Sequence, residues 1–254
     1  MKDHLASAAA LGLLAYLGAD LAHHALGHGG ACLATGGQIL LLNAVFLDCT
    51  LRGSAIDLAG PLANLLAGLA CVLVLRVAPR TPATARLFLL LSGAFNLMWF
   101  GLQLSFSVAT RSDDWAWAMQ EFHVARPLRW GAIALGALAY LMTVRWLGTG
   151  MAPFAQPRSR AWRILAASWL GAIGVALATA AADPHASTGT LWHALSQSLV
   201  LPVGLLFVPS RAAREAVPER CCAALDFSLP LAIAALLAGT LSVACLGPGI
   251  SLAQ

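Results

Sequence analysis

Long apolar runs recur along the whole chain, and each is long enough to cross a lipid bilayer as a helix. A hydrocarbon core about 30 Å thick needs roughly 20 apolar residues of helix. Only 10% of the residues are charged, whereas a soluble domain has about 25%. The runs do not alternate every second residue, which favours helices over a barrel. The predicted spans are 5–27, 56–77, 86–109, 131–148, 163–182, 191–209 and 228–248.

The sequence therefore predicts an all-α polytopic membrane protein with six or seven transmembrane helices and with lipid around it. Pro202 interrupts the span 191–209, which makes this span the weakest of the set. Residues 38–55 follow Gly36 and Gly37 and are rich in β-forming residues. We expect them to form a short membrane-associated β-hairpin after the first span.

The arginines concentrate in alternate loops, which predicts an orientation. Most of them lie in the connections after the second, fourth and sixth spans, whereas the opposite side has only Arg52, Arg111, Arg126 and Arg129. The positive-inside rule then places the N-terminus in the cytoplasm and the ends of the first and third spans outside. We expect a bacterial inner membrane protein. No basic cluster is interleaved with aromatic residues, so nucleic acid is not an expected partner.

Polar residues that interrupt apolar sequence lie almost entirely before residue 115. This contrast divides the chain into a core at 1–130 and a set of additional helices at 131–254. The six cysteines form no CxxC pair, so we expect ordinary reduced thiols. Cys71 and Cys245 lie inside apolar spans, where buried thiols are expected.

The most unusual polar residues lie together near the end of the first predicted span, in DLAHHALGHGGACLATGG at 20–37. His24 and His28 are four residues apart and share one face of a regular helix, with Asp20 one turn earlier on that face. Two imidazoles at this spacing can bind one metal ion, as in zinc helices with the pattern HExxH. The sequence therefore predicts a metal site here, with His23 as a bystander.

A catalytic zinc site needs a third protein ligand and one open position. The second span returns across the membrane, so the ends of the first and third spans lie on the same side. Asp113 and Asp114 follow the third span and are the best candidates for the third ligand. Glu121 and His123, in the same loop, are weaker candidates.

Three segments, in this order, resemble parts of the site-2-protease-type intramembrane zinc metalloproteases. HALGHGGACLATGG at 24–37 resembles the HELGH helix and following Gly-Gly of that family. DLAGPLANLLAG at 57–68 resembles its Gly-Pro-x-x-Asn helix. FNLMWFGLQLSFSVATRSDDW at 95–115 resembles its Asn-Leu helix, which ends in an aspartate ligand. The resemblance covers roughly residues 20–115.

The resemblance implies a zinc cofactor held by His24, His28 and Asp114, with Asp113 as the alternative to Asp114. It implies that the protein acts on, or binds, a transmembrane or membrane-proximal peptide segment.

The resemblance also assigns roles to residues around the metal. It makes Asn64 a hydrogen-bond donor to the oxyanion that develops on a scissile carbonyl. Asn96 would be a supporting polar residue in the third span. The strand region 38–55 would guide an extended peptide by pairing with it along one edge.

One departure from the family decides whether the chain is an enzyme. The family's general-base glutamate, directly after the first histidine, is Ala25 here. The chain would then be an engineered, inactivated protease or a natural pseudoprotease that binds without cutting. A third interpretation makes His23 the first ligand and puts His24 where the glutamate belongs. It separates the ligands by about 140° round a regular helix and requires a π-bulge, so helix geometry favours it least.

Two other classes of protein remain open. A non-catalytic membrane protein could hold a partner protein in the same groove. A different membrane metal-binding protein, such as a transporter, could use Asp20, His24 and His28, although the later spans offer few polar residues.

Overall fold

Helices dominate the computed structural model, which describes residues 3–215 and 224–251. Within these residues, seven helical stretches are long and apolar enough to cross a membrane. The expected helical fold with about seven long apolar helices is therefore confirmed in its coarse form. The stretches are Leu5–Ala34 (α1 Leu5–Leu21, η1 Ala22–Gly29 and α2 Gly30–Ala34), α3 Ser54–Val77, α4 Ala83–Thr110, α6 Arg126–Gly150, α7 Arg158–Ala181, Thr188–Arg214 and Leu229–Leu246.

Shorter elements make up two of these stretches, and two short helices lie in loops. The stretch expected at 191–209 comprises α8 Thr188–Leu195, η3 Ser196–Val200, η4 Leu201–Phe207 and α9 Val208–Glu215, with a kink at Pro202. The last stretch comprises α10 Leu229–Leu241 and η6 Ser242–Leu246. The short helices α5 Asp114–Glu121 and η2 Ala152–Phe154 lie in loops. The first helix continues to Ala34, so the histidines lie inside it rather than at its end.

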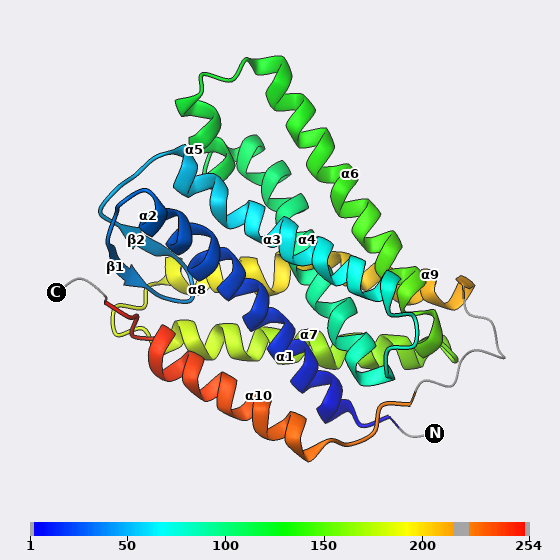
Figure 1. The fold of residues 1–254 in the computed structure, drawn as a ribbon. Coiled ribbons are helices and arrows are strands. Elements are labelled where there is room, and N and C mark those ends of the chain that lie inside the picture. The colour runs from blue at the N-terminus through cyan, green and yellow to red at the C-terminus, as the bar shows by residue number, and fades with distance from the viewer. Residues whose placement is uncertain (1–2, 216–223, 252–254) are drawn as a thin grey trace.

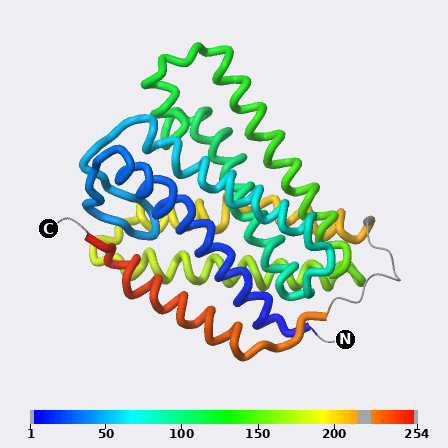
Figure 2. The backbone as a smooth tube through the Cα atoms, viewed as in Figure 1, coloured from blue at the N-terminus to red at the C-terminus, as the bar shows by residue number. Residues whose placement is uncertain are grey.

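The helix α1 begins at one end of the bundle and η6 ends at the opposite end (Figure 2). The hairpin and α2 lie at the end away from the N-terminus, and α5 lies above them (Figure 1). One hydrophobic cluster joins α1, α4 and α7, with Leu147 of α6 packed into it. The first and second halves therefore share one core. The division expected near residue 130 marks a difference in how many polar residues the helices contain, and it does not separate two independent cores.

The expected hairpin is present at the end of the first helix. Strands β1 Ile39–Leu42 and β2 Leu47–Cys49 pair antiparallel, with an irregularity between Ile39 and Leu41. Leu42 also exchanges two backbone hydrogen bonds with Ile250, which brings the C-terminal segment to the hairpin.

Two cysteines contradict the expectation of reduced thiols. Cys32 of α2 and Cys49 of β2 form a disulfide that ties the hairpin to the first helix. Their 17-residue separation follows no familiar motif, which is why spacing alone did not indicate the bond. Cys71 is half-buried and Cys245 is exposed, so the expected burial of Cys245 is also wrong. Cys221 and Cys222 lie outside the described residues.

A buried ion pair near the start of the first helix predicts that the stability of the fold depends on pH. Both carboxylate oxygens of Asp3 accept hydrogen bonds from Arg160, each 2.7 Å long. These bonds lower the pKa of Asp3 below its ordinary value, against the opposing effect of burial. A carboxyl with a lowered folded-state pKa stabilises the fold above its unfolded-state pKa, and this contribution is lost as the pH falls through the folded-state pKa.

We therefore expect Asp3→Asn to lower the unfolding temperature by a few degrees at pH 7. The difference from wild type should be constant down to about pH 5 and shrink below about pH 4. Thermal unfolding of the purified protein in detergent measures both. Asp226→Asn, at an exposed position, is the control and should change little. An Asp3→Asn effect that is the same at pH 3 as at pH 7 would contradict the assignment.

Candidate metal centre

The three histidines lie on a π-helical segment in the middle of the first helix. η1 spans Ala22–Gly29, and the side chains of His23, His24 and His28 on it are all buried. One ring nitrogen of each lies within 4.8 Å of one ring nitrogen of the others, so the cluster could hold a metal ion. The wider π turn aligns residues five apart, which is the bulge that the shifted register requires.

Three atoms converge to a single small triangle. His23 Nε2 lies 3.1 Å from His28 Nε2. Asp114 Oδ2 lies 3.3 Å from each of these nitrogens. Ligands at 2.0–2.1 Å around a tetrahedral zinc ion are about 3.3–3.4 Å apart. The triangle of His23, His28 and Asp114 therefore has the size of one face of such a site.

The outer nitrogens of both imidazoles are held by acceptors. His23 Nδ1 donates to Asn64 Oδ1 over 2.5 Å, and His28 Nδ1 donates to the carbonyl oxygen of Ile56 over 2.7 Å. Each bond puts the ring proton on Nδ1 and leaves a lone pair on Nε2. Two nitrogen lone pairs and a carboxylate oxygen then face one another at 3.1–3.3 Å. Such an arrangement favours a cation between them.

Asn64 is a positioning residue in this geometry. Its amide nitrogen donates to Ala19 O over 3.0 Å and to Asn96 Oδ1 over 2.8 Å. Asn96 in turn donates to Ser92 O. An amide has two N–H hydrogens, and both are used. Neither hydrogen is therefore left for the oxyanion role that the resemblance implies, and Asn96 is one of the two acceptors.

Removing this support should weaken metal binding. Loss of a partner that orients a metal-ligating histidine typically costs about 10–100-fold in affinity. We expect Asn64→Ala to lower zinc affinity by that factor, measured by competition with a chelator of known affinity. Asn64→Asp keeps an oxygen for His23 Nδ1 and should lose less. Wild-type affinity in Asn64→Ala would contradict the role.

The third vertex comes from the turn after α4. Asp114 begins α5, and its side chain is buried. Gln103 Nε2 donates to Asp114 Oδ2 over 2.8 Å and to Asp113 Oδ2 over 3.1 Å. Burial alone would raise the pKa of Asp114, but the imidazoles of His23 and His28 beside its carboxylate hold that pKa well below its usual range. Asp114 is thus an ionised carboxylate at the triangle.

Within the described residues, no hydrogen bond or ion pair joins Asp113 to the histidines, and Gln103 holds its carboxylate instead. Glu121 accepts a hydrogen bond from the backbone N–H of Ser54 over 2.7 Å, and His123 is exposed. The structure therefore brings Asp114, rather than these three candidates, to the centre.

His24 lies beside the triangle and has a different environment. Neither of its ring nitrogens makes a hydrogen bond. Its Nε2 is 3.7 Å from Asp20 Oδ1, and both side chains are buried. Trp99 covers the other side of the cluster by stacking on His23, with ring centroids 4.8 Å apart. Ala25 is half-buried on the same π segment and contributes no polar atom.

Close approach of two backbones makes the site possible. A Cβ on Gly27 would lie 2.5 Å from the Cα of Gly60, so η1 crosses α3 with no room for a side chain. A Cβ on Gly60 would overlap His28 Nε2. Gln103 and Gly60 were both missed in the sequence. Gln103 had a usable signal, because a glutamine within an apolar span is costly unless it has a role.

No protein-family model matches the chain, and no curated protein or solved structure is similar to it. The function must therefore be inferred from the site.

Proposed function

We propose that this protein is an intramembrane zinc metallohydrolase that cleaves membrane-embedded peptide segments. The single observation that carries the proposal is the triangle of His23 Nε2, His28 Nε2 and Asp114 Oδ2, with sides of 3.1 and 3.3 Å. Three protein ligands that leave a fourth position open are typical of catalytic rather than structural zinc. Two nitrogens and a carboxylate oxygen form a donor set that suits zinc.

The ligand set in this proposal differs from the one that the family resemblance implied. His23 replaces His24, while His28 and Asp114 keep their roles. This register was the least favoured on regular helix geometry because it requires a π-bulge. The π segment supplies that bulge. His24 then occupies the position of the family's glutamate, and Ala25 needs no catalytic function.

The residues of the site can be assigned separate tasks. Zinc at the triangle would supply a Lewis acid that polarises a carbonyl group and makes a water molecule more acidic. Asn64 and the Ile56 carbonyl orient the two imidazoles, and Gln103 orients Asp114. His24 has a free nitrogen next to the ligands and is placed to accept a proton from water, with Asp20 to hold its other side.

The setting of the site supports a membrane-embedded substrate. The histidines and Asn64 lie within helices that are apolar enough to span a bilayer. We propose the bacterial inner membrane and a cytoplasmic N-terminus, as the arginine distribution predicts. An extended peptide would pair with β2, since Leu42 of β1 already bonds to Ile250.

Proteolysis in reconstituted vesicles tests the proposal. The purified, zinc-loaded protein is incubated with a library of single-span peptides, and products are identified by mass spectrometry. We expect cleavage by the wild type and none by Asp114→Ala. His24→Ala should retain zinc but lose about 10²–10⁴-fold in rate, the usual contribution of a general base. A wild type that binds zinc and cleaves no peptide would contradict the hydrolase and favour a non-catalytic binder.

Ala25→Glu separates the two registers. In the register of the family resemblance, this substitution restores the missing base and raises activity from a negligible level. In the register proposed here, it adds a carboxylate away from the reacting atoms and does not raise the activity. A large gain of activity in Ala25→Glu would therefore overturn the assignment of His23 and His24, while leaving the protease proposal intact.

A further inference from the structure

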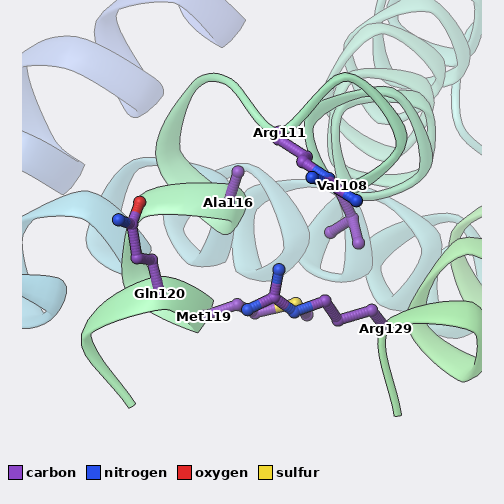
Figure 3. A pocket seen from close by; sticks show the side chains of 6 residues that line it. All are labelled: Val108, Arg111, Ala116, Met119, Gln120 and Arg129. Carbon is purple, nitrogen blue, oxygen red and sulfur yellow. The ribbon is translucent and has the colours of Figure 1, made fainter. Parts of the chain in front are cut away.

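A second polar site lies near the metal centre, where the end of α4, the helix α5 and the start of α6 surround a pocket of about 270 Å³ (Figure 3). None of the residues that hold the metal triangle lines it. The lining residues are Val108, Arg111, Ala116, Met119, Gln120 and Arg129.

Two arginines line this small space from different elements. Arg111 ends α4 in a left-handed conformation (φ 58°), and Arg129 comes from the first turn of α6. Figure 3 shows the two arginines on opposite sides of the pocket, with Ala116 and Gln120 of α5 beside them. Arg129 Nε donates to the carbonyl oxygen of Val124 over 3.0 Å, which orients its guanidinium group. No ion pair joins either arginine to a carboxylate in residues 3–215 and 224–251.

Large exposed side chains mark the level of this pocket along the membrane normal. Trp117 of α5, Phe122 after it and Trp130 of α6 are 52%, 61% and 62% exposed. Tryptophan is enriched where a membrane meets water, because its ring is both apolar and a hydrogen-bond donor. The pocket also lies where two spans end and begin. Its arginines are therefore placed at the depth of lipid headgroups.

We propose that this pocket binds a phosphate group, supplied by an anionic phospholipid. Guanidinium groups match phosphate oxygens in bidentate geometry, and Arg111 and Arg129 can hold one phosphate between them. The Gln120 amide offers a further N–H donor. Val108, Met119 and Ala116 give apolar walls against which the glycerol and first methylene groups pack. The inference does not rest on the proposed hydrolase activity.

The pocket and the metal centre share the helix α5. Asp114 and Ala118 lie on its buried face, whereas Ala116, Met119 and Gln120 line the pocket. A lipid bound there holds α5 between α4 and α6, and so holds the start of α5, where Asp114 lies.

Native mass spectrometry of the detergent-solubilised protein tests the site. Equal amounts of phosphatidylglycerol and phosphatidylcholine with the same acyl chains are added, and retained adducts are counted. We expect the wild type to retain at least five times more phosphatidylglycerol than phosphatidylcholine. A tenfold difference in affinity between the two lipids would be more than enough to give this ratio. The double variant Arg111→Gln, Arg129→Gln should lose this preference. Gln120→Glu, which adds a repelling charge at an exposed position, should lose it too.

Arg126→Gln is the matched control, because Arg126 is exposed in the same turn of α6 but does not line the pocket. It should keep the wild-type preference. The proposal is overturned if the double variant and Gln120→Glu both keep the preference, or if Arg126→Gln loses it equally. A second arm adds inorganic phosphate and measures the unfolding temperature. If phosphate raises the unfolding temperature of a wild type that shows no lipid preference, the bound phosphate group does not come from a phospholipid, and the proposal is overturned.

Discussion

His23→Ala should abolish stoichiometric zinc binding, whereas His24→Ala should leave it nearly unchanged. His23 Nε2 is one vertex of the triangle with His28 and Asp114, and its other nitrogen is held by Asn64. His24 has no such partner. Removing a ligand should lower the zinc affinity more than removing a partner that orients a ligand. We therefore expect the zinc affinity of His23→Ala to fall by more than about 100-fold.

Metal content after dialysis, and titration against a chelator, measure this difference. His28→Ala and Asp114→Ala should behave as His23→Ala does. His185→Ala removes an exposed histidine and is the control for nonspecific binding. Zinc that is lost in His24→Ala but retained in His23→Ala would restore the regular helical register and refute the triangle.

Gly60→Ala should also abolish zinc binding, although it removes no ligand. The new Cβ would overlap His28 Nε2, so the imidazole cannot keep its position. His28 must then rotate away from Asp114. We expect a loss comparable to that of His28→Ala, together with a lower unfolding temperature, since forced overpacking typically costs about 1–3 kcal/mol.

Gly30→Ala is the matched control. It lies two residues after His28 on the same continuous helix, and a Cβ there would meet nothing within 4 Å. It should bind zinc as the wild type does and unfold at the same temperature or slightly higher, because alanine favours helix over glycine. Normal zinc binding in Gly60→Ala would mean that His28 is not held where the structure places it.

The spans could be predicted because they depend on local composition alone. An apolar run of about 20 residues is long enough to span a bilayer as a helix wherever its neighbours lie. Even Pro202 did not prevent the sixth helical stretch, since a kink there is accommodated by two short helices. The ends were less predictable. α2 extends the first helix past the glycines 29 and 30, where its packing near the hairpin outweighs their low helix propensity.

The residue types of the site could be predicted, but their register could not. The sequence shows three histidines and two aspartates, and regular α-helical periodicity selects His24 and His28. The π segment changes which histidines align. Its causes are tertiary, since the backbone contact of Gly27 with Gly60 and the bond from His23 to Asn64 both join the first helix to α3. Residues 22–29 contain no local sequence pattern that predicts these two contacts.

The covalent link between Cys32 and Cys49 also reports a compartment. Disulfides persist where thiols are exposed to an oxidising environment, and the reducing cytosol removes them. The bond lies at the end of the first helix, beside the hairpin and on the same side of the bundle as α5 (Figure 1). The bond thus supports the orientation proposed above, in which this end faces the periplasm, independently of the scarcity of arginines there. Under the proposed function, a substrate would then reach the site from the periplasmic side.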